Sequence, residues 1–100
     1  MTWHRVMALS GLEKGKGKSA EVGGLVLAFF NVNGEICAIQ NQCLHRGGPL
    51  GEGYLEGNDV TCPWHAWQFN VKTGECGTMP GAKQKTFKTK VEKGEIYVDL

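Results

Sequence analysis

The chain has 100 residues, with 11 Lys and Arg against 10 Asp and Glu and a formal net charge of +1 at pH 7. This length fits one domain, over residues 1–100, with a small core that a bound metal would help to stabilise. The near-balanced charge argues against a nucleic-acid-binding protein, which would need a strongly basic surface. The first residues lack the apolar stretch of a signal peptide, and no segment has the about 18 apolar residues of a membrane span, so we expect a cytoplasmic protein.

Fifteen glycines and three prolines separate short apolar segments along the chain. This punctuation favours short strands and tight turns over helices, so we predict an all-β fold. The first predicted strand covers residues 3–7. Residues 9–17 are predicted to be a loop, in which the alternating lysines and glycines form a solvated turn and not a phosphate-binding motif.

The clearest local signal is a hairpin. Residues 25–32 (LVLAFFNV) and 35–40 (EICAIQ) are rich in β-branched and aromatic residues and are separated by Asn33-Gly34. Asn-Gly supplies the positive φ angles of a two-residue turn, so the two segments are predicted to pair. Cys37 lies within the second strand and is expected to be a small core residue.

Two short segments combine cysteine with histidine: Cys43 and His45 in one, Cys62 and His65 in the other, in the pattern C-x-H-x16-C-x2-H. Two thiolates and two neutral imidazoles suit either a tetrahedral zinc ion or an iron–sulfur cluster with histidines on one iron. Zinc fingers usually place two cysteines in one loop and two histidines in the other, whereas both loops here hold Cys and then His. The spacing therefore favours the cluster and leaves zinc as the minority alternative.

The region around these segments is predicted to contain only short strands. Residues 50–61, which separate them, hold a turn flanked by two strand-like pieces. Cys76 follows the turn Thr73-Gly74, and we expect its side chain to be partly exposed. A disulfide between Cys37 and Cys76 is left open by the sequence.

A second hairpin is predicted at the end of the chain, from residues 86–92 and 95–100 around the turn Lys93-Gly94. Alternation predicts one covered and one solvated face of an antiparallel sheet, with Phe87, Thr89 and Val91 on the first and Lys88, Lys90 and Glu92 on the second.

The pattern of cysteines and histidines resembles the Rieske [2Fe-2S] motif, and the likeness extends to Gly47 and Gly48 after the first histidine and to Pro63 in the second loop. The resemblance covers nearly the whole chain. It implies a β-sandwich with a small cluster-binding subdomain of two ligand loops, at about residues 41–80. It also implies one [2Fe-2S] cluster per chain, with Cys43 and Cys62 on one iron and His45 and His65 on the other.

Other residues of the loops are expected to surround the cluster: Arg46, Gly47, Gly48, Trp64, Trp67 and Pro80. We expect Trp67 mainly to pack and shield, whereas packing and partner contact are evenly balanced for Trp64. The expected docking surface for a partner protein consists of Leu44, Arg46, Pro49 and Trp64.

The chain departs from the high-potential members of that family. Gly48 and Trp64 stand where those proteins carry disulfide cysteines, and Trp67 and Phe69 stand where they carry hydroxyl donors. Fewer donors to cluster sulfur leave the reduced state less stabilised. We therefore expect the low-potential group, with a midpoint potential of about −150 mV.

The expected function is electron transfer and not catalysis, because one one-electron cluster in a short chain without a flavin or nucleotide motif leaves no room for a small-molecule substrate. The resemblance implies a soluble Rieske-type ferredoxin that passes single electrons from a flavin-containing reductase to the terminal oxygenase of an aromatic-ring-hydroxylating dioxygenase system. The alternative is the small subunit of an NAD(P)H nitrite reductase, which the segment Cys-Pro-Trp-His with a Trp shortly after also resembles. A structural zinc-binding interaction domain is the remote alternative.

Overall fold

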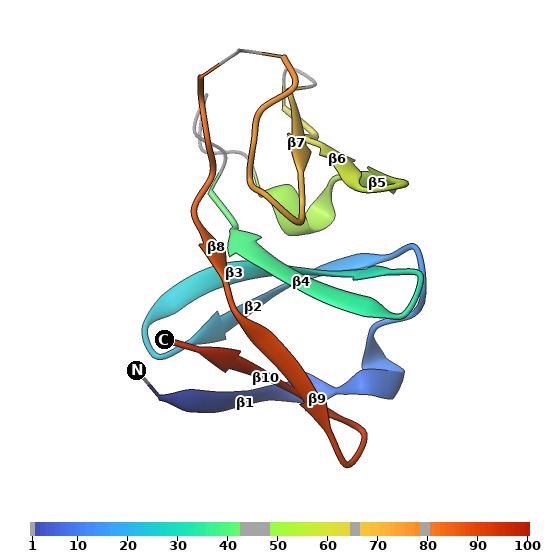
Figure 1. The fold of residues 1–100 in the computed structure, drawn as a ribbon, viewed down its shortest axis with the longest axis vertical. Helices are drawn as coiled ribbons and strands as arrows, with labels where there is room; N and C mark the ends of the chain where they lie inside the picture. Colours follow the sequence, from blue (N-terminus) through green and yellow to red (C-terminus); the bar gives the residue numbers. More distant parts are fainter. Residues whose placement is uncertain (1, 43–48, 65–66, 79–80) are drawn as a thin grey trace.

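The computed structural model describes residues 2–42, 49–64, 67–78 and 81–100. Within these residues the strands form three antiparallel sheets, which lie one above the other in Figure 1. The lower sheet has the order β1 (Trp3–Ala8), β10 (Glu95–Asp99), β9 (Thr89–Glu92). The middle sheet has the order β2 (Gly17–Val22), β3 (Leu25–Val32), β4 (Glu35–Gln40), β8 (Thr86–Phe87). The upper sheet has the order β5 (Tyr54–Glu56), β6 (Asp59–Thr61), β7 (Gln68–Asn70) and follows the 3₁₀ helix η2 (Leu50–Glu52). The all-β prediction is confirmed.

The hairpin of β3 and β4 has the predicted bounds and turn. Asn33 and Gly34 have φ angles of 54° and 102°, and Val32 pairs with Glu35 next to the turn. The buried Asn31 supports this turn, because its side-chain oxygen accepts a hydrogen bond from the Gly34 N–H at 2.7 Å. The short predicted pieces within 50–61 are likewise found as β5 and β6.

The two central strands of the middle sheet, β3 and β4, are buried on both faces over most of their length. Leu27 and Phe29 of β3 belong to one cluster of buried side chains, while Ala28 and Phe30 belong to another. β4 follows the same alternation, as expected for side chains that point to opposite faces of a strand. The apolar run 27–30, without polar interruption, is typical of such a strand, whereas Leu25 and Val26 before it are exposed.

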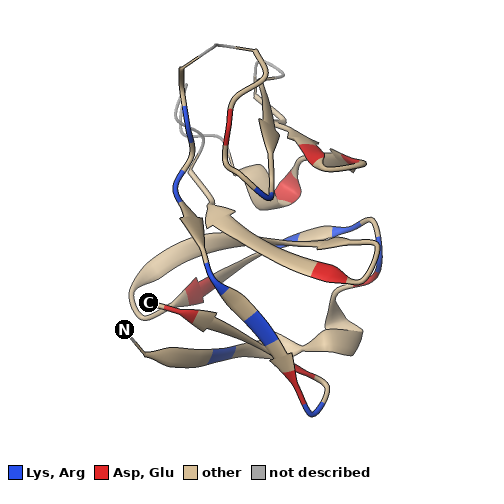
Figure 2. Cartoon of the chain, viewed as in Figure 1, with Lys and Arg blue, Asp and Glu red and all other residues tan. Residues whose placement is uncertain are grey.

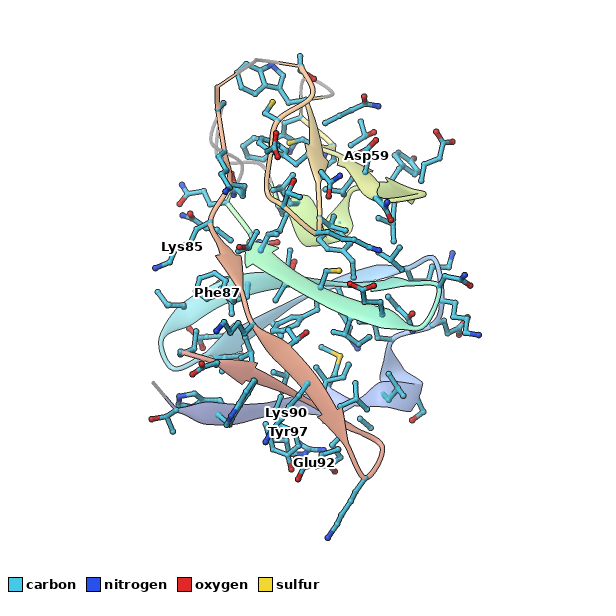
Figure 3. The ribbon with its side chains drawn as sticks, in the orientation of Figure 1. Asp59, Lys85, Phe87, Lys90, Glu92 and Tyr97 are labelled. Atoms are coloured by element: carbon cyan, nitrogen blue, oxygen red, sulfur yellow. The ribbon has the colours of Figure 1, made fainter. Side chains whose placement is uncertain are left out.

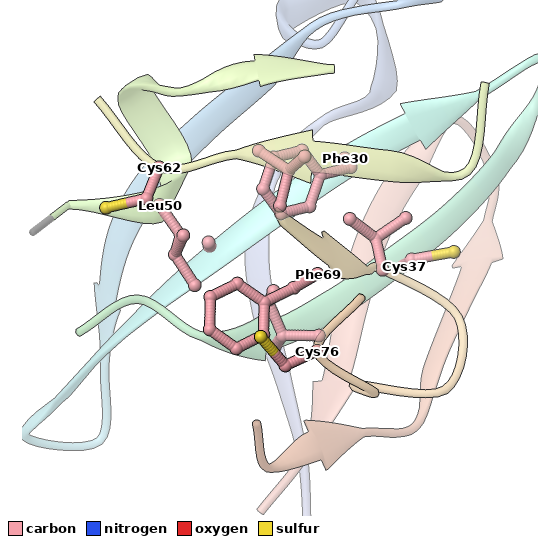
Figure 4. Close-up of a cluster of buried hydrophobic side chains, with 10 residues drawn as sticks. Phe30, Cys37, Leu50, Cys62, Phe69 and Cys76 are labelled. Atoms are coloured by element: carbon pink, nitrogen blue, oxygen red, sulfur yellow. The ribbon is translucent and has the colours of Figure 1, made fainter. Parts of the chain in front are cut away.

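Two cores result, one on each side of the middle sheet. The lower core consists of Leu12, Val22, Leu27, Phe29, Ile36, Ala38, Ile96 and Val98. The upper core, drawn in Figure 4, consists of Ala28, Phe30, Cys37, Ile39, Leu50, Val60, Cys62, Phe69, Val71 and Cys76.

The segment 86–92 is not one strand, contrary to the prediction. Its first part, β8, pairs with β4, and its second part, β9, pairs with β10. The chain changes sheets at Lys88, and Thr89 fixes the crossing by donating from its hydroxyl to the Ile36 carbonyl at 2.7 Å. Because it changes sheets, this one segment supplies an edge strand to both the middle and the lower sheet. The alternation of apolar and polar residues alone does not reveal such a change.

The predicted division of β9 into a covered and a solvated face is also partly wrong. Val91 is 42% exposed, because β9 is an edge strand. Lys90 is partly covered: its Nζ lies 4.6 Å from the centre of the Trp3 ring and 5.5 Å from that of Tyr97 (Figure 3). Such contacts hold the aliphatic stem of a lysine against aromatic rings on one face of the lower sheet.

Residues 9–17 contain more structure than the predicted loop. A 3₁₀ helix, η1, covers Leu9–Gly11, and Leu12 enters the lower core with 2% exposure. β2 begins at Gly17 and pairs with β3 over its full length. Its sequence, GKSAEV, has little strand propensity, so this strand depends on its partner and was not predicted.

Candidate metal centre

Cys62 lies directly after β6 and is a 2% exposed member of the upper core, at the edge of the cluster drawn in Figure 4. Its N–H donates to the Trp67 carbonyl at 2.7 Å, which brings the two ends of segment 62–67 together. The N–H of Trp64 donates to the Cys62 sulfur at 3.4 Å. A buried sulfur that accepts a backbone N–H is suited to act as a thiolate ligand, because the hydrogen bond stabilises its negative charge.

The ends of the first Cys/His segment are also held together. Gln42 and Pro49 form an isolated antiparallel bridge, and the Leu50 N–H donates to the Asn41 carbonyl at 2.8 Å. The Asn41 side-chain oxygen accepts from the Gly51 N–H at 2.8 Å and from the Ser19 hydroxyl at 2.9 Å. We call residues 41–42 and 49–50, at the two ends of the first segment, its stem. The hydrogen bond from Ser19 of β2 to Asn41 attaches this stem to the middle sheet.

Most predicted ligands and loop residues lie outside the described residues. These are Cys43, Leu44, His45, Arg46, Gly47, Gly48, His65 and Pro80. Their roles therefore stay predictions. In the described part of the chain, no group of three or more His, Cys, Asp or Glu side chains could hold a metal ion.

The two tryptophans of the second segment differ in exposure. Trp67 is partly buried and packs against the upper core, which fits the expected packing role. Trp64 is 51% exposed, which leaves its indole available to a partner protein. Pro49, expected on the docking surface, is half-buried.

A third segment lies beside the second one. The Gln68 N–H donates to the Thr78 hydroxyl at 3.0 Å, and the Gly77 N–H donates to the Gln68 carbonyl at 2.9 Å. The Cys76 N–H donates to the Ala82 carbonyl at 3.0 Å. These bonds place residues 76–78 along β7, the strand that follows Cys62 and His65 in the chain.

The remaining described cysteines are core residues. Cys37 is 7% exposed, as predicted, but Cys76 is 6% exposed, and the expectation that it is partly exposed is wrong because the chain folds back over it onto Phe69. Burial raises the pKa of the Cys37 thiol and the Glu35 carboxylate adds to this rise, while Lys72 opposes it. Among the described cysteines no disulfide is formed, and a protonated, buried Cys37 is a poor metal ligand.

The described residues suit a Rieske-type cluster by their donor chemistry. Cys62 offers a soft sulfur ligand in a dry, carbon-lined core, next to a histidine at position 65. Cys62 shares the upper core with Leu50 and Phe69, both 0% exposed. Burial and hydrogen bonds to sulfur, such as the one from the Trp64 N–H, are among the features by which a protein sets a cluster's potential.

Two residues near the site were missed in the sequence, Asn41 and Gln84. Both are amides that bind backbone groups around the first Cys/His segment, and no motif marks such a residue. An N–H or C=O group that needs a partner becomes visible only once the chain is folded.

Charge is unevenly placed over the molecule. Figure 2 shows acidic positions around the upper sheet and basic ones along the segment that holds β8 and β9. The acidic residues include Glu52 of η2, Glu56 of β5 and Asp59 of β6. Among the helices of the described residues, none is long and apolar enough to cross a membrane.

Comparison with known proteins gives matches over nearly the whole chain. The family model described as Rieske [2Fe-2S] domain matches residues 2–93. The chain is 36% identical over 99 residues to the ferredoxin component of the naphthalene 1,2-dioxygenase system of Pseudomonas putida, covering 98% of this chain and 95% of that protein. It is 43% identical over 77 residues to the 3-phenylpropionate/cinnamic acid dioxygenase ferredoxin subunit of Escherichia coli (strain K12), covering 75% and 73%.

Solved structures agree with these relatives. The Sphingomonas yanoikuyae B1 ferredoxin superimposes with a TM-score of 0.90 at 27% identity, covering 99% of both chains. A chain from the complex of reduced oxygenase and oxidized ferredoxin in carbazole 1,9a-dioxygenase superimposes with a TM-score of 0.87 at 34% identity, covering 96% of this chain and 91% of that one.

Proposed function

The chain belongs to the Rieske [2Fe-2S] domain family, and from this membership we propose that it carries single electrons from a reductase to the terminal oxygenase of an aromatic-ring-hydroxylating dioxygenase system. The observation that carries the proposal is the match to a dioxygenase ferredoxin component over 98% of this chain and 95% of that protein. Its cofactor is a Rieske-type [2Fe-2S] cluster, and it is an electron-transfer component and not an enzyme.

We propose Cys43, His45, Cys62 and His65 as the cluster ligands, with the cysteines on one iron and the histidines on the other. The burial of Cys62 and the hydrogen bond that its sulfur accepts support this assignment. The bridge between Gln42 and Pro49 supports it too, because it anchors the first segment beside the upper core. When bound, the cluster takes up and gives off one electron at a time.

The chain's own residues would control how electrons reach the cluster. Cys62 belongs to the buried upper core together with Leu50 and Phe69, so we propose that transfer takes place at the outer side of the ligand segments. Leu44, Arg46, Pro49 and Trp64 are the proposed docking residues there. The exposed Trp64 is suited to contact a partner, since aromatic side chains contribute strongly to small protein interfaces.

Two partners are proposed, both proteins, in the cytoplasm. A similar chain is found in a solved complex of oxygenase and ferredoxin, which supports a terminal oxygenase as the acceptor. A flavin-containing reductase is proposed as the donor, because a one-electron carrier needs a donor that divides the electron pair of a nicotinamide cofactor.

The test is to purify the protein anaerobically and measure iron, sulfide, zinc and the EPR spectrum after dithionite reduction. We expect a [2Fe-2S] signal with the low average g value of histidine-ligated centres and a midpoint potential of about −150 mV. Turnover with a flavin reductase and an aromatic dioxygenase should depend on the protein. Stoichiometric zinc without iron would contradict the cluster, and a cluster that supports no transfer to the oxygenase would contradict the proposed role.

A further inference from the structure

Gln84 joins the connection before β8 to the stem of the first Cys/His segment. Its side chain is 0% exposed, and its Nε2 donates to the Gln40 carbonyl at 2.8 Å and to the Gln42 carbonyl. The Gln40 N–H in turn donates to the carbonyl of the next residue, Lys85, at 2.8 Å. Figure 1 shows this connection running beside the end of β4. One amide group therefore holds two carbonyls of the chain just before Cys43.

The second of these carbonyls has a special position in the chain. The Gln42 carbonyl belongs to the peptide unit that joins Gln42 to Cys43, and this unit is planar. A restraint on its oxygen therefore restrains the orientation of the bond that leads into a proposed cluster ligand. No further side chain or flexible torsion lies between the Gln84 amide and that peptide plane.

The backbone of Gln84 contacts the other half of the site. Its N–H donates to the Gly74 carbonyl at 2.7 Å, and the Gly74 N–H donates to the carbonyl of Asn70, the last residue of β7, at 2.7 Å. Gly74 has a φ of 82°, and a Cβ there would collide with the Gln84 carbonyl oxygen. The backbones thus approach as closely as only glycine allows. β7 directly follows the segment that holds Cys62 and His65.

The other end of the Gln84 amide is costly to bury. Its Oε1 is buried and has no hydrogen-bond partner within the described residues. An unpaired buried acceptor carries a desolvation penalty, which a methionine of similar length would avoid. Stabilisation of the fold alone therefore explains poorly why an amide stands at position 84. Its donation to the Gln40 and Gln42 carbonyls explains it.

We propose that Gln84 is a positioning residue that sets the first ligand segment against the second and thereby fixes the geometry of the cluster site. The proposal rests on the ligand assignment given above. Residues that orient ligands from outside the coordination sphere typically alter metal affinity by about 10-fold to 100-fold when replaced. Gln84 is expected to act in this range.

The test compares Gln84→Met with Thr89→Val in the cluster-loaded protein. Both substitutions remove a side-chain donor to a backbone carbonyl in or just after β4: Gln84 donates to Gln40 and Gln42, and Thr89 donates to Ile36 at 2.7 Å. Only the Gln84 bond lies next to Cys43 in the chain. We expect Gln84→Met to lose its cluster to a chelator about 10-fold to 100-fold faster and to show a broadened EPR spectrum with shifted g values. Thr89→Val should lower the melting temperature and leave both cluster measurements unchanged.

A Gln84→Met protein with the native EPR spectrum and the native rate of cluster loss would overturn the proposal, as would equal effects in Thr89→Val.

If Gln84→Met does not fold, Gln84→Asn serves instead, since it keeps the amide but cannot span both carbonyls. If neither folds, hydrogen exchange in the native chain decides: the Gln84 NH₂ should exchange at least about 10-fold more slowly than that of the exposed Gln68, in line with its burial. Equal rates would overturn the proposal. Absence of any iron–sulfur signal in the native protein would instead contradict the ligand assignment.

Discussion

The two cores of this protein share one sheet but differ in chemistry. The buried members of the lower core, among the described residues, are all hydrocarbon side chains, and they lie between the lower and the middle sheet. Thr2 and Leu100 extend the pairing of β1 with β10 by hydrogen bonds of 2.9 and 3.0 Å, which join the two ends of the chain. The upper core includes three thiols, and one of them, Cys62, is a proposed cluster ligand.

This difference indicates how the stability of the fold is divided between the two cores. The described lower core consists of the chain's own hydrocarbon side chains, whereas the upper core includes the sulfur of a proposed cluster ligand. Short strands such as β5, β6 and β7, of three residues each, have little stability of their own. Binding of a metal group couples to folding of the part that supplies the ligands. We therefore expect cluster loss to loosen the upper sheet and to spare the lower one.

Replacing His65 by alanine tests this division most strongly. Loss of a ligand should remove the [2Fe-2S] EPR signal or destabilise the cluster by more than the about 100-fold effect of changes outside the coordination sphere. Hydrogen exchange should then show lost protection in β5 to β7 and retained protection in β1, β9 and β10. Uniform loss of protection would show that the two cores unfold as one unit.

A matched pair of substitutions on β4 separates the cores with a smaller effect. Ile39 belongs to the upper core and Ile36 to the lower core, on opposite faces of one strand. Ile39→Val and Ile36→Val should each lower the free energy of unfolding by about 0.5–1.5 kcal/mol, measured by denaturant titration. Only Ile39→Val should also speed cluster loss to a chelator. Equal cluster loss in the two variants would mean that the middle sheet transmits strain between the cores.

Sequence reasoning predicted the parts of the fold that local chemistry determines. Asn33-Gly34 was sufficient for the turn between β3 and β4, and the apolar run 25–30 was sufficient to predict a strand, which is buried from Leu27 onward. The Cys and His spacing predicted the kind of cofactor, because ligand identity and separation follow directly from the sequence.

Features that depend on distant partners could not be predicted. β2 is a strand only because β3 lies beside it, and Cys76 is buried only because the chain returns over β7. The role of Gln84 arises from two carbonyls that are about forty residues away in the chain. Such long-range pairing leaves no periodic signal in the sequence, so the structure was needed to find it.

The smallest expected effect concerns docking, and it again contrasts the upper end of the molecule with the lower sheet. Electron-transfer encounters bury little surface and are transient, so a few residues near the cluster should dominate them. Arg46→Glu should slow transfer to the oxygenase in a reconstituted assay and change its dependence on salt, while the visible spectrum stays the same, because a charge at the rim acts mainly on association rate.

The exposed Lys88, where the chain passes to the lower sheet, offers the matched control. It undergoes the same change in charge as Arg46 when replaced by glutamate. Lys90 is a poorer choice, since its Nζ also stacks on Trp3 and Tyr97, and its loss would disturb the lower sheet by about 0.5–1 kcal/mol. If Lys88→Glu impaired transfer more than Arg46→Glu, the partner would dock on the side of the sheets, away from the ligand segments. The exposed Trp64 would then have no part in the interface.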